Sequence, residues 1–275
     1  MIPLWGQTFD SLLLDKLKSN DPNLSSSEVE LLKTVSIYEW AESIKVANDN
    51  VAKNSELNYI LNKFIVRFSD LIKASKQASG NPDLLVTSWR SLFEVAVVFR
   101  VLSQTIIQNS DIKVFQELIS RFKDYGILSS GSVFDSMKVE EKYKNAKKIH
   151  QLKNEYDWLN PAFPEQVAKR FSKPYSPSFR DLIFRTRESD TDLFLLTNLY
   201  EKASNALHFN FLSDKIISEI NPDDLESSVD EVGRVFLYDY LRMVSKLYSV
   251  SGNKTPSTDT LIALSSQLSK IIRFR

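Results

Sequence analysis

The sequence predicts an all-α protein, a multi-helix bundle built around one long central apolar helix at residues 82–108. Through most of the chain, apolar residues recur every three or four positions, which is the period of one buried helix face. Only six glycines occur in 275 residues, whereas sheet proteins with many tight turns use more of them. The segment 92–102 is apolar on every side except at Glu94 and Arg100, as is typical of a helix that its neighbours cover.

Composition excludes several classes of protein. Hydrophobic residues make up 43% and charged residues 25% of the chain, which are ordinary values for a globular protein. The chain has no cysteine, so disulfides, thiolate metal sites and cysteine nucleophiles are excluded and a reducing interior is favoured. It has no run of about 18 apolar residues and no basic segment followed by an apolar one at its N-terminus. We therefore expect a cytoplasmic protein with no membrane span and no signal peptide.

In the first half of the chain, the apolar periodicity predicts helices at residues 9–17, 28–53, 55–78, 82–108 and 111–125. Asn81 is the expected N-cap of the central helix, and Pro82 is its expected first residue. Gly126 is expected to end the helix that precedes it, because glycine commonly occupies the position after the last helical residue.

The second half of the chain is more charged and less regular. Residues 134–159 carry many charges and few apolar side chains, so we expect a solvated helix or an arm there. Asn160 and Pro161 are expected to start a short helix, and two prolines in residues 173–178 predict an extended linker. Ser178 is the expected cap of the next helix. Further helices are predicted at residues 191–212, 222–250 and 258–272.

These elements group into three expected parts. Residues 1–55 form an N-terminal helical segment. Residues 56–213 form a core helical domain, which carries the polar residues discussed below as a candidate site. Residues 214–275 form a C-terminal helical pair that packs on this core.

Charge is segregated along the chain, although Lys plus Arg and Asp plus Glu each total 35. Residues 138–187 contain twelve basic and six acidic residues, a net charge of +6, and residues 214–239 contain two basic and eight acidic residues, a net charge of −6. Two interpretations stay open. The two stretches are solvated faces that attract each other, or the basic stretch, with its interleaved aromatic residues, is an electropositive ledge for RNA or a nucleotide.

Five polar residues on two apolar helices form the candidate site. Arg90 and Glu94 lie one turn apart, and Tyr200, Ser204 and His208 follow one another at the same four-residue spacing, which places them on one helical face. We expect the two groups to meet within reach of a hydrogen bond or a single water. Apolar neighbours suggest that Arg90 and Glu94 are buried, where a charge is costly unless it is paired. The cluster is either a structural ion pair or a functional pocket.

The segments WRSLFE (residues 89–94), FRDL (179–182) and LYEKASNALH (199–208) resemble domain-of-unknown-function family 5677, a set of bacterial all-helical proteins. The resemblance covers about residues 57–212. The characteristic positions that it implies here are Arg90, Glu94, Tyr200, Ser204 and His208, with Arg180 and Asp181 as softer matches. It implies a setting in mobile-element or phage-defence biology and carries no settled activity.

Several other chemistries lack their motifs. The chain has no phosphate-binding glycine loop of the GxxxxGK[ST] or GxGxxG type and no GxSxG nucleophile elbow. Its two histidines are His150 and His208, and no HExxH pair is present. Neither histidine follows an arginine at the spacing that helical RNases of the HEPN class use. We therefore expect no metal and no cofactor.

The first of two functional hypotheses is a non-enzymatic or regulatory module. It binds a protein partner, a second copy of itself or an anionic ligand through the pocket of Arg90, Glu94 and His208. Arg180 and Asp181 are further ligand-binding residues. The charged groups of these residues suit oxyanions and complementary polar groups on a partner.

The second hypothesis is a nuclease-like enzyme. His208 acts as the general acid/base, Tyr200 and Ser204 position the substrate, and Arg90 stabilises negative charge in the transition state. An unperturbed histidine titrates near physiological pH, which suits it for this role.

Overall fold

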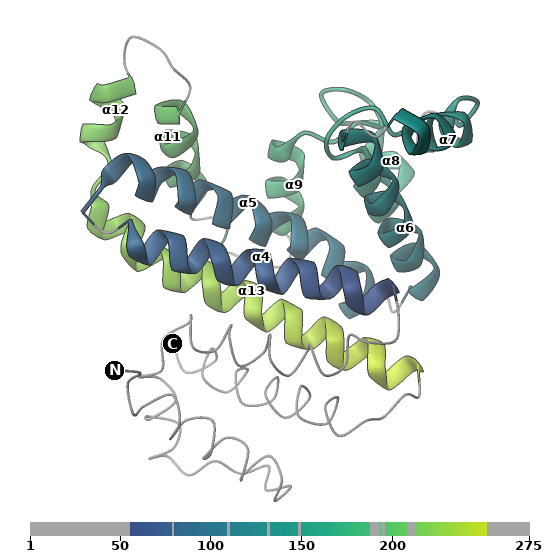
Figure 1. The fold of residues 1–275 in the computed structure, drawn as a ribbon, viewed down its shortest axis with the longest axis horizontal. Coiled ribbons are helices and arrows are strands. Elements are labelled where there is room, and N and C mark those ends of the chain that lie inside the picture. The colour runs from purple at the N-terminus through teal and green to yellow at the C-terminus, as the bar shows by residue number, and fades with distance from the viewer. Residues whose placement is uncertain are drawn as a thin grey trace, which may run out of the picture. The chain divides into compact units, whose positions relative to one another are not determined.

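The computed structural model describes residues 56–251, apart from positions 79, 109–110, 131–132, 148–149, 188–192, 194–195 and 208–212. In this part of the chain all regular secondary structure is helical and no strand occurs, so the predicted all-α fold is confirmed there (Figure 1). The elements are, in chain order, α4 (Glu56–Gln77), α5 (Pro82–Ile107), α6 (Ile112–Ser129), α7 (Val133–Tyr143), the 3-10 helix η3 (Asp157–Ala162), α8 (Glu165–Ala168), α9 (Phe179–Arg187), α11 (Thr197–Leu207), α12 (Ser213–Glu219) and α13 (Pro222–Ser251). The helices expected at residues 9–17, 28–53 and 258–272 lie outside the described residues.

The helices α5 and α6 begin where the sequence predicts. Pro82 is the first residue of α5, and the Asn81 side-chain oxygen accepts a hydrogen bond of 3.2 Å from the Leu84 backbone N–H. At the start of α6, the Asp111 carboxylate accepts a hydrogen bond of 3.0 Å from the Val114 N–H. These acceptors satisfy N–H groups that the first turn of a helix otherwise leaves without partners.

The starts of α9 and α13 also follow the sequence. In α9, the Asp181 N–H donates to the Ser178 hydroxyl at 3.3 Å, and the Ser178 N–H donates to the Asp181 carboxylate at 2.8 Å. This reciprocal pair is a capping box with Asp in place of Glu. The helix α13 begins at Pro222, and the Asn221 side-chain oxygen accepts a hydrogen bond of 3.1 Å from the Asp223 N–H.

The expected end of α6 at Gly126 is wrong. The helix continues through this residue to Ser129, and the Ser130 N–H donates to the Gly126 carbonyl at 3.1 Å. A glycine that ends a helix adopts a left-handed conformation, which Gly126 does not have. A glycine inside a helix costs only about 1 kcal/mol relative to alanine, so the surrounding helix tolerates it.

The expected helix start at Asn160 and Pro161 is also wrong. Both residues lie inside η3, which begins at Asp157. Because Pro161 has no N–H, it cannot form the bond to the carbonyl three residues earlier that a 3-10 helix requires. That carbonyl, of Trp158, accepts a hydrogen bond of 3.3 Å from Arg121 Nε instead.

The charged segment 134–159 is only partly a solvated helix. The helix α7 covers its first part, and most of the α7 side chains from position 135 onward are exposed. The later part returns into the interior, where Leu152 and Trp158 are buried. The sequence misses this return because polar residues surround the few apolar ones.

The expected extended linker at residues 173–178 contains a tight turn. The Ser176 N–H donates to the Lys173 carbonyl at 2.9 Å. Between them, Tyr175 has a φ of +62°, the left-handed region that a tyrosine rarely adopts. Pro174 therefore lies inside this turn and Pro177 directly follows it, so the prolines do not extend the chain.

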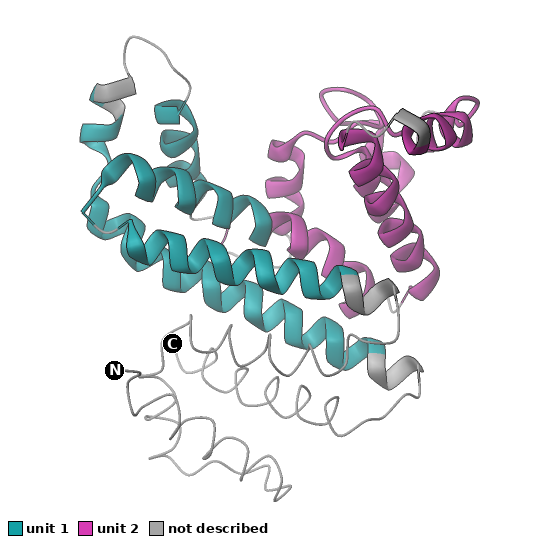
Figure 2. Ribbon diagram, viewed as in Figure 1, with its two compact units in different colours: residues 1–96, 196–275 teal, residues 97–195 magenta. Residues whose placement is uncertain are grey.

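The chain divides into two compact units (Figure 2). Unit 1 comprises residues 1–96 and 196–275, and unit 2 comprises residues 97–195. The boundary falls within α5, so this helix is continuous from one unit into the other. The division follows other boundaries than the three expected parts, since unit 1 combines segments from both ends of the sequence.

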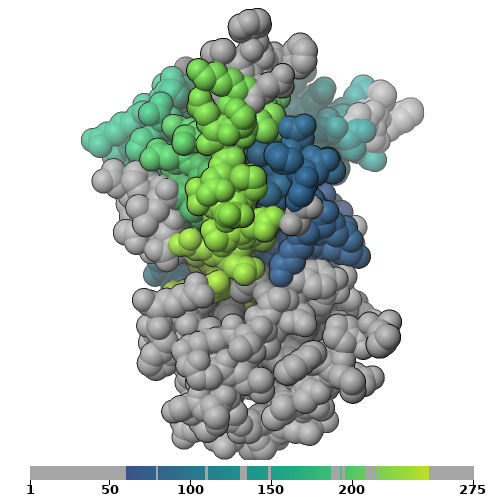
Figure 3. All heavy atoms as spheres, turned by 90° about the vertical axis from the view of Figure 1, so that its left-hand side faces the viewer, coloured from purple at the N-terminus to yellow at the C-terminus, as the bar shows by residue number. Residues whose placement is uncertain are grey.

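The described core of unit 1 consists of α4, the first part of α5 and α13, which run alongside one another (Figure 1). Phe68 of α4 stacks on Phe236 of α13 with ring centroids 3.8 Å apart. The Trp89 indole N–H of α5 donates to the Ser228 hydroxyl of α13 at 2.6 Å. Figure 3 views this unit from the end at which α13, in yellow-green, lies beside α4 and α5, in blue.

In unit 2, the helix α6 packs on η3. The rings of Phe122 and Trp158 lie 4.7 Å apart, and Phe115, Leu118 and Leu159 are fully buried. Among the helices that the structure describes, none has both the length and the apolarity that crossing a bilayer requires.

Candidate functional site

Arg90, Glu94 and Tyr200 form a hydrogen-bonded cluster in unit 1, which we call the Arg–Glu–Tyr cluster. Arg90 Nε donates to Glu94 Oε1 at 3.0 Å, one turn along α5. The Tyr200 hydroxyl of α11 donates to the same carboxylate oxygen at 2.9 Å. The expected meeting of the two helices is therefore present for Tyr200, which is 106 positions from Glu94 in the sequence.

An aromatic stack holds Tyr200 in place. Its ring stacks on Phe93 with centroids 5.2 Å apart, and Phe93 stacks on Trp89 at 5.4 Å. Phe93 and Trp89 are fully buried, and the Trp89 indole is itself bonded to Ser228. The phenol therefore rests against a rigid wall of the core, and the direction of its hydroxyl is set before any ligand arrives.

The Arg90–Glu94 pair is half-exposed, which differs from the burial that its apolar neighbours suggest. The Arg90 and Glu94 side chains retain 29% and 28% of their solvent exposure. Both lie on the least covered stripe of α5, which also contains the exposed Thr87 and the half-buried Ser91 and Val98. Residues three and four apart share a helix face, so this stripe is continuous along α5.

The electrostatics of the cluster favour a charged Arg90 and a neutral Tyr200. Burial acts to lower the pKa of Arg90, but the Glu94 carboxylate and the Tyr200 side chain outweigh it and raise that pKa above its ordinary value. Burial and then the negative Glu94 raise the pKa of Tyr200 to about 12. Glu94 thus sits between a cation and a phenol that keeps its proton.

The other two residues of the second motif are placed less fully. Ser204 is half-buried on α11, one turn beyond Tyr200. His208 lies outside the described residues, so its predicted role as a general acid/base stays a prediction. The chemistry that the structure brings together is therefore that of a cation, a carboxylate and a phenol.

Arg180 and Asp181 belong to unit 2, whereas the residues of the Arg–Glu–Tyr cluster belong to unit 1. The Asp181 carboxylate accepts hydrogen bonds from the backbone N–H and the hydroxyl of Ser178 at 2.8 and 2.6 Å, so it caps the start of α9. Arg180 is exposed, and its guanidinium lies 5.7 Å from the centre of the Phe184 ring. These contacts give Asp181 a local structural role, and the ligand-binding role expected for both residues stays a prediction.

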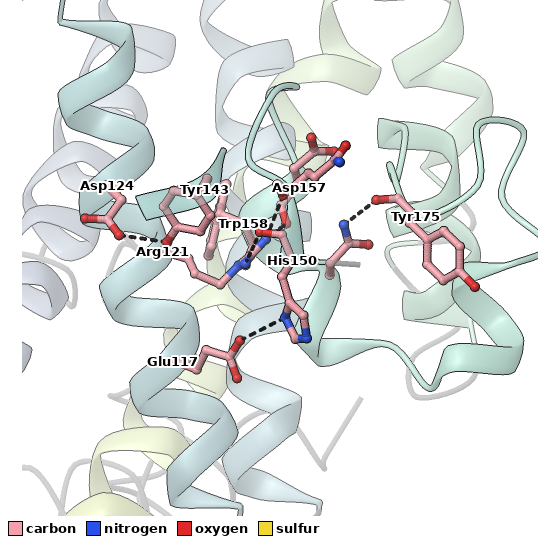
Figure 4. A network of polar contacts seen from close by, with 10 residues as sticks. Glu117, Arg121, Asp124, Tyr143, His150, Asp157, Trp158 and Tyr175 are labelled. Atoms are coloured by element: carbon pink, nitrogen blue, oxygen red, sulfur yellow. Dashed lines mark hydrogen bonds and ion pairs between the residues drawn. The ribbon is translucent and has the colours of Figure 1, made fainter. Parts of the chain in front are cut away.

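Unit 2 contains a second polar network, centred on Arg121, that the sequence did not reveal (Figure 4). Arg121 is only 3% exposed, and its guanidinium donates to four backbone carbonyls of the segment 150–158. The shortest of these bonds, 2.7 Å, reaches the Asp157 carbonyl. Burial lowers the pKa of Arg121. A guanidinium has five N–H donors in a fixed plane, which suits it to bind several carbonyls at once.

Asp124 extends this network toward α7. Its carboxylate accepts hydrogen bonds from the Tyr143 hydroxyl at 2.7 Å and from Lys142 Nζ at 2.6 Å. Burial and the bond to Asp124 raise the pKa of Tyr143. Nearby, His150 Nδ1 lies 3.7 Å from the Glu117 carboxylate, and both side chains are exposed.

A weak signal of the Arg121 network exists in the sequence. Arg121 lies three residues after Leu118, so it borders the apolar face of its own helix. A charged residue on such a face indicates either that the face is wrongly assigned or that the charge is buried with hydrogen-bonding partners. Its partners are backbone carbonyls about thirty residues away, and no side-chain pattern identifies them.

Within the described residues, no group of three or more His, Cys, Asp or Glu side chains is arranged to hold a metal ion. No family model, no curated protein and no solved structure matches the chain. The resemblance to domain-of-unknown-function family 5677 therefore stays an expectation from the motifs.

Proposed function

We propose that the Arg–Glu–Tyr cluster is a binding site for an oxyanion group, a carboxylate or a phosphate, on a ligand or a partner protein. The observation that carries this proposal is the state of Arg90. Its guanidinium is fixed by Glu94 at 3.0 Å, yet 29% of its side chain remains exposed. A cation that is held in place and reaches solvent is prepared to bind an anion without further ordering.

The division of roles within the cluster follows from its hydrogen bonds. Glu94 occupies Arg90 Nε and the Tyr200 side chain also contacts the guanidinium, whereas a guanidinium carries four further N–H donors on its two terminal nitrogens. Paired donors of this kind bind carboxylates and phosphates through two parallel bonds. Tyr200 donates to Glu94 and so fixes the carboxylate. Glu94 and Tyr200 are thus positioning residues, and Arg90 is the ligand-binding residue.

A carboxylate beside the cation also sets a limit on the ligand. Glu94 cancels part of the positive charge of Arg90, so a small free anion gains little from charge alone. A ligand that adds a neutral or apolar part beside its oxyanion gains more from the same surface. The nuclease-like alternative depends on His208, whose position is not described, and no contact in the described residues favours it.

The proposal is tested by titration calorimetry with inorganic phosphate, citrate and adenosine monophosphate as probes. Arg90→Lys keeps the charge but loses the paired donors, so we expect affinity for the bound probe to fall about tenfold, which is about 1.4 kcal/mol. Arg67→Gln, which removes an exposed arginine of α4 in the same unit, is the matched control and should leave affinity unchanged.

Two results would contradict this function. Wild-type protein that binds none of the three probes has no oxyanion site of the proposed kind. Equal affinity of wild type and Arg90→Lys for every probe that binds would place the site elsewhere. A thermal melt of each variant establishes that it is folded at the temperature of the titration.

A further inference from the structure

Tyr175 in unit 2 has an unusual backbone conformation. Its φ of +62° makes it the one non-glycine residue with positive φ in the described part of the chain. A side chain with a Cβ disfavours this region, and glycine or asparagine is the usual occupant. A tyrosine here persists only because the surrounding structure fixes it, and such positions cluster at functional sites.

Two buried polar residues of η3 hold the turn from beneath. The Asn160 side-chain amide donates to the Tyr175 carbonyl, and the Asp157 carboxylate accepts a bond of 2.6 Å from the Ser176 hydroxyl. Asn160 is fully buried and Asp157 is 2% exposed. The Tyr175 N–H donates to the Ala168 carbonyl of α8 at 2.9 Å. The backbone of Tyr175 is therefore tied on both sides to the core.

This backbone presents the Tyr175 ring outward. The ring is half-buried and points away from the network around Arg121 and Asp157 (Figure 4). Its role is therefore not to fill the core, which the large apolar side chains of α6 and η3 already occupy. A rigid turn that displays an aromatic ring to solvent resembles the stacking platforms of nucleic-acid-binding proteins.

Exposed cations lie near Tyr175 in the sequence and on its turn, and one of them, Lys169, interacts with the Tyr175 side chain. Lys169 Nζ bonds the Glu165 carboxylate at 2.8 Å, and this bond, together with the Tyr175 side chain, raises the pKa of Lys169. Lys147 is close enough to act on Glu165 as well. Lys173, two residues before Tyr175, donates from Nζ to Asn154 Oδ1 at 3.0 Å. The exposed Arg170 follows Lys169 directly.

We propose that Tyr175 and the lysines around it form a binding site for single-stranded nucleic acid. A base stacks on the Tyr175 ring, and Lys169, Lys173 and their basic neighbours bind the flanking phosphates. Several exposed cations in the segments that flank one aromatic ring suit a strand with successive phosphates better than a single nucleotide. A base inside a duplex has no free face, so double-stranded nucleic acid is excluded by the stacking step. The site lies in unit 2 and does not depend on the function proposed for Arg90.

The test measures fluorescence anisotropy of a labelled oligouridylate strand of about ten nucleotides with full-length protein at low salt. Tyr175→Asn removes the ring but retains a residue that accepts the left-handed backbone. We expect it to weaken binding about fivefold or more, the loss that corresponds to one stacked base, with a melting temperature no lower than that of wild type. Tyr175→Phe retains the ring and should bind like wild type.

A second pair of variants tests how much the lysine charge contributes to binding. Lys169→Gln should weaken binding and reduce the dependence of affinity on salt, because one phosphate contact is lost. Lys73→Gln, which removes an exposed lysine of α4 in unit 1, should change neither. A DNA strand of the same length shows whether the 2′-hydroxyl contributes, and uridine monophosphate shows whether one nucleotide suffices.

Four outcomes would overturn the proposal. The first two are no binding of either strand and equal binding of wild type and Tyr175→Asn. The other two are binding of an RNA duplex of the same length, or of the mononucleotide, that is as tight as binding of the single strand. A lower melting temperature for Tyr175→Asn would assign the tyrosine a structural role in place of a binding one. Arg90→Lys should bind the strand like wild type, so failure here is distinct from failure of the oxyanion site.

Discussion

Tyr200 connects α11 to α5 through one hydroxyl group. It donates to Glu94 at 2.9 Å, and burial, followed by the negative charge of Glu94, raises its pKa to about 12. An unfolded tyrosine titrates at about pH 10. The neutral phenol is therefore the form that the folded state prefers, and this preference is a contribution to stability that depends on pH.

We predict that Tyr200→Phe lowers the free energy of unfolding by about 1 kcal/mol at neutral pH, the common net value of one hydrogen bond. Because the folded pKa is raised, this stabilisation is complete below about pH 10 and is lost as the pH rises toward 12. The difference between wild type and Tyr200→Phe should therefore shrink across that range.

Urea unfolding at a series of pH values measures this difference. Tyr238→Phe on α13, where the ring lies 5.2 Å from the Arg242 guanidinium, serves as a control for removal of a hydroxyl. A difference between wild type and Tyr200→Phe that is constant through alkaline pH would show that the Glu94 contact does not favour the neutral phenol.

At the scale of elements, Arg121 joins α6 to the segment that leads into η3. Residues 151–156 form no regular helix or strand, so no secondary structure satisfies the hydrogen-bonding groups of their backbone. The Arg121 guanidinium donates hydrogen bonds to four carbonyls in and beside this segment. A buried carbonyl without a donor is costly, so this side chain takes the place of secondary structure.

We predict that Arg121→Lys lowers the free energy of unfolding by on the order of 3 kcal/mol. A lysine ammonium has three donors on a single point and cannot span four carbonyls. Each carbonyl that loses its donor costs about 1–3 kcal/mol. Urea unfolding measures the loss, with Arg170→Lys at an exposed arginine of the same unit as the control. Equal stability of the two variants would show that water replaces the guanidinium.

Gly126 and Gly80 make a matched pair of glycines that differ in backbone conformation. Gly126 lies inside α6, and Gly80 lies before α5 with a φ of +86°. A Cβ added at either position meets nothing within 4 Å, so steric clashes do not distinguish them. The two positions therefore differ in their backbone conformation.

We predict opposite effects of alanine at these positions. Gly126→Ala should raise the free energy of unfolding by about 0.5–1 kcal/mol, because alanine favours the helix and restricts the unfolded chain. Gly80→Ala should lower it by about 1–2 kcal/mol, because alanine is strained in a left-handed conformation. Thermal melts of the two variants, side by side, decide the signs. Destabilisation by Gly126→Ala would indicate that α6 needs the glycine for a bend.

At the scale of the whole molecule, one helix belongs to both compact units. The helix α5 is continuous from Pro82 to Ile107, and the boundary between the units falls after Ala96. If one unit unfolded alone, α5 would have to break in its middle. The residues at the break, Phe93 to Phe99, are largely buried, and new helix ends would expose unsatisfied backbone groups there.

We therefore predict that both units unfold in one transition. Trp89 reports on unit 1 and Trp158 on unit 2, and both are buried. The chain has two further tryptophans, Trp5 and Trp40, which are replaced by phenylalanine in the background protein. Adding Trp158→Phe or Trp89→Phe leaves one reporter, and the unfolding midpoints in urea should coincide once each is corrected for the stability of its variant. Two separate midpoints would show that α5 does not couple the units.

The helical class and the starts of α4, α5, α6, α9 and α13 followed from the sequence alone. These depend on local signals, the apolar period of 3.6 residues and the cap residues, which act within one or two turns. Asn81 and Ser178 cap the helices that the sequence predicts them to cap. Where the local signal was ambiguous, as at Gly126 and Pro161, the prediction was wrong, because glycine and proline are tolerated inside a helix that tertiary contacts support.

The pairing of Arg90 and Glu94 with Tyr200 was also within reach of the sequence, because equal spacing on two apolar helices predicted that their polar faces meet. The solvent exposure of the Arg90–Glu94 pair could not be predicted from the sequence. The covering of α5 depends on which helices pack on each of its faces, and α4, α11 and α13 leave the stripe around Arg90 partly open. Solvent exposure is a property of the assembled units and not of one helix.

Tertiary structure alone decided the Arg121 network and the turn at Tyr175. Arg121 binds backbone carbonyls 29 to 37 positions away, and every residue type presents the same carbonyl, so no sequence pattern identifies them. The left-handed φ of Tyr175 opposes the local preference of a tyrosine. It exists because Asn160 and Ala168 bind its backbone from two other elements. Local preference fixes the helices of this protein, and long-range hydrogen bonds fix the irregular segments between them.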